Sequence, residues 1–60
     1  MTGADRTLAT RALVDDAART LAMADIELGD PAHDRQRIER LLLDALNLTL
    51  HALAALRGRT

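Results

Sequence analysis

The sequence predicts an all-α fold: an antiparallel two-helix hairpin that pairs with a second copy to form a four-helix bundle. Three observations support this prediction. Residues 5–28 contain no Gly or Pro and carry apolar side chains at helical spacing. The tripeptide Gly29-Asp30-Pro31 then interrupts the pattern. The following segment, residues 31–57, has apolar side chains over about two thirds of its circumference, whereas a surface helix needs a stripe of roughly 100°.

The whole chain, residues 1–60, is expected to form one domain, because its length is too short for two. A domain of this size buries only about 60% of the surface of its unfolded chain and is marginally stable alone. Small proteins compensate with disulfides, a metal or oligomerisation. The chain has no Cys and only two His, which excludes disulfides and disfavours a zinc site. We therefore expect oligomerisation, most simply a homodimer.

The first helix is predicted over about residues 5–28. Asp5 is suited to cap its N-terminus, with Thr2 as an earlier alternative. Leu8, Met23 and Ile26 fall outside the main apolar stripe and are interpreted as scattered exposed residues, with a second contact with a partner as the alternative. The stripe expected to pack against the second helix consists of Leu13, Val14, Ala17, Ala18, Leu21, Ala24 and Leu28.

The turn between the helices is predicted at residues 29–31. Gly29 can adopt the left-handed conformation that often follows a helix. Asp30 is a favourable N-cap, and Pro31 suits the first position of a new helix. The second helix is therefore expected from about residue 31 to about Arg57, with Gly58 as its stop signal. A connection this short predicts antiparallel helices.

The second helix presents two apolar faces. The Leu face holds Leu42, Leu46, Leu50 and Leu53, the Ala-rich face holds Leu41, Ala45, Leu48, Ala52 and Ala55, and Ile38 and Leu56 lie between them. These residues are the predicted interface set: one face meets the first helix and the other meets a partner. The sequence leaves the assignment open. Small side chains permit the closer helix approach, which favours the Ala-rich face as the seam between subunits.

A narrow polar line separates the two faces on the other side of the helix: His33, Arg37, Arg40, Asp44, Asn47 and His51. A carboxylate and an imidazole on one helix can bind a metal or transfer a proton. However, the chain lacks the Glu-x-x-His motif of carboxylate-bridged bundle sites. We therefore interpret Asp44, Asn47 and His51 as solvated or interface-rim residues and predict no catalytic, cofactor-binding or metal site. A site assembled across subunits is the alternative.

A small basic cluster is formed by Arg35, Arg37 and Arg40, with Arg57 and Arg59 at the far end of the helix. Arginines can contact the phosphates of nucleic acid. The formal net charge of −1 and the absence of aromatic residues disfavour that partner. We interpret the cluster as a solvated face.

The sequence contains no phosphate-binding loop, no nucleophile–base arrangement and no cofactor motif. The main hypothesis is a small non-enzymatic protein–protein interaction or oligomerisation module, acting in assembly, docking or regulation. Its partner would be a second copy or a helix of another protein. The alternatives are a small dimeric nucleic-acid-binding regulator and an accessory subunit of an enzyme complex, to which Asp44 and His51 would contribute.

Targeting signals are not evident in the sequence. The apolar run over residues 41–56 is interrupted by polar residues and is shorter than the ~20 residues that a bilayer requires. The N-terminal residues include acids and lack the long apolar core of a secretion signal. We therefore expect no membrane association and a cytoplasmic location.

Overall fold

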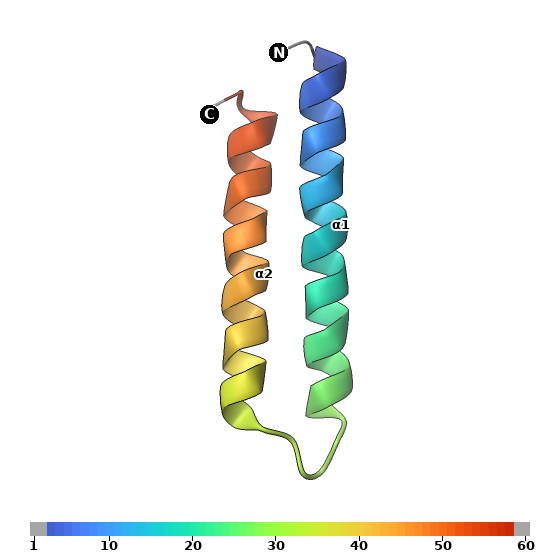
Figure 1. The fold of residues 1–60 in the computed structure, drawn as a ribbon, viewed down its shortest axis with the longest axis vertical. Coiled ribbons are helices and arrows are strands. Elements are labelled where there is room, and N and C mark those ends of the chain that lie inside the picture. Colours follow the sequence, from blue (N-terminus) through green and yellow to red (C-terminus); the bar gives the residue numbers. More distant parts are fainter. Residues whose placement is uncertain (1–2, 59–60) are drawn as a thin grey trace.

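The computed structural model describes residues 3–58, which form two antiparallel α-helices and the connection between them (Figure 1). α1 spans Gly3–Leu28 and α2 spans Arg35–Leu56. The helices lie side by side, and the start of α1 lies at the same end of the hairpin as the end of α2. No strand occurs within residues 3–58. The predicted all-helical hairpin is therefore confirmed.

α1 begins earlier than predicted. It already includes Gly3, so Asp5 lies in the first turn and not at the N-cap position. The earlier alternative, Thr2, lies outside the described residues. An acidic side chain in the first turn is still favourable, because it lies near the positive end of the helix dipole. The Thr7 hydroxyl donates a hydrogen bond to the Gly3 carbonyl at 2.9 Å, which further supports this turn.

The end of α1 also differs from the prediction. Gly29 does not adopt the left-handed conformation. Among the described residues, only Gly58 has a positive φ. The backbone N–H of Gly29 is instead bonded to the carbonyl oxygens of Asp25 and Ile26, at 3.2 and 3.1 Å. The N–H of Asp30 then bonds to the carbonyl of Glu27 at 3.1 Å. These bonds tighten the last turn of the helix and satisfy its carbonyls without a left-handed residue.

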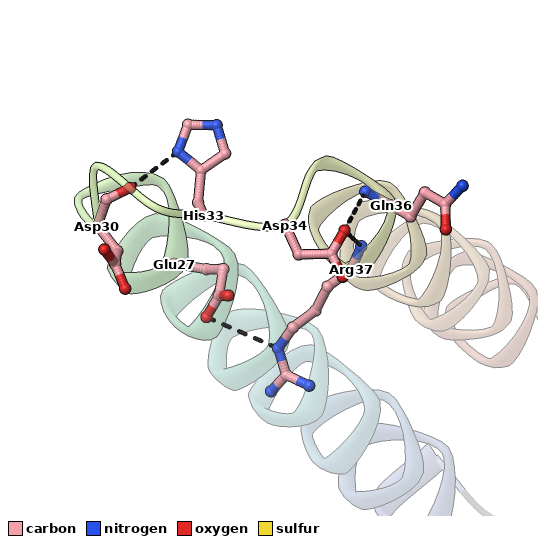
Figure 2. A network of polar contacts seen from close by, with 6 residues as sticks. All are labelled: Glu27, Asp30, His33, Asp34, Gln36 and Arg37. Carbon is pink, nitrogen blue, oxygen red and sulfur yellow. Dashed lines mark hydrogen bonds and ion pairs between the residues drawn. The ribbon is translucent and has the colours of Figure 1, made fainter.

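α2 begins at Arg35, not at about residue 31, and its N-cap is Asp34 rather than Asp30. One carboxylate oxygen of Asp34 accepts hydrogen bonds from the backbone N–H groups of Gln36 and Arg37, at 2.9 and 3.4 Å (Figure 2). These two groups would otherwise lack a partner at the start of the helix.

Asp30 stabilises the connection instead. Its carboxylate accepts a hydrogen bond from the N–H of Ala32 at 2.9 Å, which closes a turn around Pro31. Its carbonyl accepts from the N–H of His33 at 3.1 Å and lies 2.9 Å from the Nδ1 of the same residue (Figure 2). His33 therefore lies in the connection, not in a helix as predicted. Helix formation here would bury no large apolar side chain, and burial is what stabilises short helical segments.

The end of α2 agrees with the prediction. Arg57 caps the helix, and Gly58 follows in the left-handed conformation with a φ of 75°. The N–H of Gly58 bonds to the carbonyl of Ala55 at 3.1 Å. A Cβ on Gly58 would lie 2.9 Å from the Nη2 of Arg6. The absence of a side chain therefore also lets Arg6 of α1 pack over the end of α2.

The helices meet along an interhelical seam made mostly of small side chains. Its buried residues are Ala17 and Ala24 of α1 and Ile38, Ala45 and Ala52 of α2. Its half-buried residues include Leu13, Thr20, Leu41, Leu48 and Ala55. The residues recur at alternating spacings of three and four, as in a coiled coil. Because four of the five buried residues are Ala, the helices can approach closely but bury little apolar volume.

The Ala-rich face of α2 therefore packs against α1. Ile38, Ala45 and Ala52 expose only 6%, 3% and 5% of their surfaces within one chain. The sequence-based preference for this face as the seam between subunits is wrong. Small side chains do allow a close approach, but the short connection keeps α1 beside α2 at a high effective concentration. The tethered helix therefore occupies the face that fits it best.

The predicted apolar stripe of α1 divides between two surfaces. Leu13, Ala17 and Ala24 lie in the interhelical seam, whereas Val14, Ala18, Leu21 and Leu28 are exposed. Thr10 and Thr20 are half-buried beside the seam residues. Their hydroxyls donate to backbone carbonyls one helical turn earlier, at 2.8 and 2.9 Å. With the polar atom satisfied, each threonine can present its methyl group to α2.

Candidate interaction surface

The hairpin is a single layer of two helices, with principal dimensions of 46 × 15 × 9 Å. A layer one helix thick has two broad sides. When two antiparallel helices are viewed from one end, their residues advance in opposite rotational senses. Equivalent heptad positions of the two helices therefore fall on the same side of the seam.

One side carries large aliphatic side chains from both helices. We define the outer apolar face as Val14, Leu21 and Leu28 of α1 and Leu42, Leu43, Leu46, Leu50, Leu53 and Leu56 of α2. Each of these residues exposes between 39% and 60% of its surface. The α2 members include the whole Leu face predicted from the sequence. The α1 members were expected to lie against α2, and the structure leaves them available to a partner.

The other side is polar. Asp16 of α1 and Arg37, Asp44 and His51 of α2 flank the seam there, with Arg40 and Asn47 next to them. Leu8, Met23 and Ile26 are exposed on α1, as predicted, and Met23 and Ile26 lie away from the outer apolar face. Scattered apolar residues of this kind are common on protein surfaces. A continuous apolar face beside a polar one is the feature that requires an explanation.

The solvent-exposed area of the chain is larger than that of a compact protein of the same mass. The chain exposes 4723 Å², whereas a compact monomer of its mass would expose roughly 3800 Å². The excess is comparable to the ~800 Å² that each partner buries in a standard protein–protein interface. The elongated single-layer shape accounts for the excess, and covering one side of the layer would remove it.

The residues that could bind a metal or transfer a proton have exposed side chains on α2. Asp44, Asn47 and His51 all lie on its polar side. Within residues 3–58, no group of three His, Cys, Asp or Glu is arranged to hold a metal ion. The interpretation of these residues as solvated side chains accords with their exposure.

Carboxylates lie beside two of the three clustered arginines. The Nε of Arg35 lies 3.4 Å from the Oε1 of Glu39, and the Nε of Arg37 lies 3.6 Å from the Oε2 of Glu27. The second pair links the two helices next to the connection (Figure 2). Arg40 has no ion pair within the described residues. The charge that the cluster offers to a phosphate is thus partly offset.

The far end of α2 adds little to this cluster. Arg57 is exposed, and Arg59 lies outside the described residues. Neither α1 nor α2 is long and apolar enough to cross a membrane, and this applies to residues 3–58.

Comparison of the chain with protein-family models, with curated proteins and with solved structures finds no match. Its function therefore has to be inferred from the surface itself. The dominant feature of that surface is the outer apolar face.

Proposed function

We propose that this protein is a small non-enzymatic interaction module that associates with a second copy through its outer apolar face, forming a four-helix bundle. One observation carries the proposal. Ile38 is the only large aliphatic residue that the described hairpin buries, whereas nine others lie exposed on one side. Two layers of helices are the usual minimum for a helical core. A second hairpin would supply the missing layer.

The energetics support association. Covering the exposed half of a Leu side chain contributes about 1 kcal/mol. The outer apolar face offers eight Leu side chains and one Val side chain in each copy. Their combined contribution is of the same order as the ~4–15 kcal/mol that association costs in lost freedom. A stable dimer thus requires that most of the face be covered.

The role that follows is assembly, docking or regulation in the cytoplasm, with the polar side left free for further contacts. A helix from another protein could occupy the same face in place of the second copy. The alternatives of a nucleic-acid-binding regulator and of an enzyme subunit gain no specific support from the described residues.

The test is the molar mass of the purified protein in solution, measured by sedimentation equilibrium or light scattering at micromolar concentration. We expect the mass of two chains. A folded monomer would overturn the proposal.

A matched pair of variants locates the interface. Leu46→Asp places a carboxylate at the centre of the outer apolar face, and burying it without a partner costs several kcal/mol. We expect its dimer Kd to rise at least ~100-fold. Ile26→Asp makes the same change at an exposed position of α1 away from that face, and we expect it to remain dimeric. If the two variants have the same dimer Kd, the interface does not lie on the outer apolar face.

A further inference from the structure

Three residues form a line on α1 that borders the outer apolar face: Arg11, Ala18 and Asp25, at seven-residue intervals. All three are exposed. Neither Arg11 nor Asp25 makes an ion pair within the described part of the chain. The line therefore carries an unpaired positive charge toward the free end of the hairpin and an unpaired negative charge toward the connection. A small residue lies midway between them.

A second hairpin can cover the outer apolar face in two symmetric ways, and both keep neighbouring helices antiparallel. If the two-fold axis is parallel to the helices, the connections lie at the same end and α1 packs on α2 of the second copy. If the axis is perpendicular to the helices, the connections lie at opposite ends. Each helix then packs on its own counterpart.

Charge distinguishes the two arrangements. Glu27 and Arg37 contact each other across the hairpin at 3.6 Å, so Asp25 and Glu39, each two residues farther from the connection, lie at the same height. With the connections at the same end, Asp25 would face Glu39 of the second copy, and two like charges would meet, with the charge of Glu39 only partly offset by the exposed Arg35 beside it. With the connections at opposite ends, Arg11 of each copy would face Asp25 of the other. Opposite charges at an interface rim favour the second arrangement.

The apolar residues of α1 agree with this choice. Along α1, the midpoint between Val14 and Leu21 nearly coincides with the midpoint between Arg11 and Asp25. The register that pairs the charges therefore also sets Val14 of one copy against Leu21 of the other. Ala18 lies at the midpoint, where a small side chain lets the two α1 helices approach.

We infer that the second copy lies with its connection at the opposite end, and that two symmetric Arg11–Asp25 ion pairs hold the dimer in register. The inference rests on the proposed function and extends it. It commits the outer apolar face to a second copy of this chain and assigns the order of helices in the bundle. α1 neighbours α1 of the second copy, and α2 neighbours α2.

Exchanging the charges tests this arrangement. Arg11→Asp and Asp25→Arg each replace two attractive contacts per dimer with two repulsive ones. At low ionic strength we expect each single variant to raise the dimer Kd about tenfold. The double variant restores both pairs with their polarity reversed, and we expect its Kd to return to within about threefold of the original.

Arg40→Asp and Asp44→Arg make the same changes of charge on the polar side of the hairpin and should leave the Kd unchanged. If the connections lay at the same end, Asp25→Arg would tighten the dimer by removing its repulsion with Glu39. That result, or a double variant that is not restored, would overturn the inference while leaving the dimer intact. A monomeric wild-type protein would instead contradict the proposed function.

An introduced cysteine gives an independent readout, because the chain has no Cys of its own. Ala18→Cys would lie near its own counterpart at the two-fold axis, so mild oxidation should link two chains covalently. Ala12→Cys, which is exposed on the opposite side of α1, should not cross-link efficiently. Equal cross-linking of the two variants would contradict the inferred arrangement.

Discussion

The interhelical seam is more buried than the outer apolar face, yet its side chains are smaller. The seam is buried, yet four of its five buried residues are Ala. The outer apolar face is half-exposed, yet it consists of Leu and Val alone. In most small domains the large aliphatic residues are the ones inside. The inversion indicates that close contact between α1 and α2 shapes the hairpin, while most of the large aliphatic side chains lie outside that contact.

The largest difference between the two regions should appear when the same substitution is made at neighbouring positions. Ala45 is buried in the seam and Leu46 lies on the outer apolar face. Ala45→Asp buries a carboxylate between the two helices, at a cost of several kcal/mol that so small a domain cannot offset. We expect loss of the helical circular dichroism signal at every protein concentration.

Leu46→Asp should instead act through association. Its helical signal should depend on concentration and recover when the concentration is raised. If Ala45→Asp keeps its helical signal, the seam is not where the structure places it.

The next largest loss of stability is expected when a large side chain is placed in the interhelical seam. Ala17→Leu forces a large side chain into the close contact between the helices, and overpacking of this kind costs about 1–3 kcal/mol. Ala22→Leu adds the same atoms at an exposed position of the same helix. We expect only the first variant to lower the urea midpoint at a fixed protein concentration. Equal midpoints would mean that the helices are not closely packed at Ala17.

The end of the seam at the connection depends on the N-cap of α2. Asp34→Ala removes the acceptor for the N–H groups of Gln36 and Arg37 and should cost about 1 kcal/mol. Asp30→Ala removes one bond within the connection and should cost less. Thermal unfolding of both variants at one concentration measures the difference. The reverse order would favour the sequence-based assignment of Asp30 as the cap.

The smallest effect is expected at the other end of the seam. Gly58→Ala places a Cβ on a residue with a φ of 75°, only 2.9 Å from the Nη2 of Arg6. We expect a loss of roughly 0.5–1 kcal/mol in the free energy of unfolding, because an end residue can relax by fraying. Gly3→Ala, which meets no neighbouring atom, is the control. A loss equal to that of the control would show that the left-handed turn does not hold Arg6 in place.

The sequence was most informative where one residue has a strong local preference. The absence of Gly and Pro over residues 5–28 predicted a long first helix, and Gly58 marked the end of the second. It was less informative at Gly29-Asp30-Pro31, because Asp30 and Asp34 are both good caps. The choice between them depends on which segment can bury apolar side chains against α1. Only Ile38 and the residues after it can do so.

The sequence also could not divide the candidate surface between partners. It identified both apolar faces of α2 but preferred the wrong one as the seam between subunits. On α1 it placed Val14, Leu21 and Leu28 inside the hairpin and overlooked Thr10 and Thr20. Threonine is counted as polar in a hydrophobic pattern, and its satisfied hydroxyl is visible only in the folded helix.

By itself, the sequence determined that the chain forms two helices and that α2 has more apolar surface than one neighbour can cover. These properties follow from local propensity and from periodicity, which act within a single helix. Only the tertiary structure decided that the Ala-rich face is used inside the hairpin and the Leu face is left outside. That choice depends on how closely two tethered helices can approach, and the approach distance is a property of the pair.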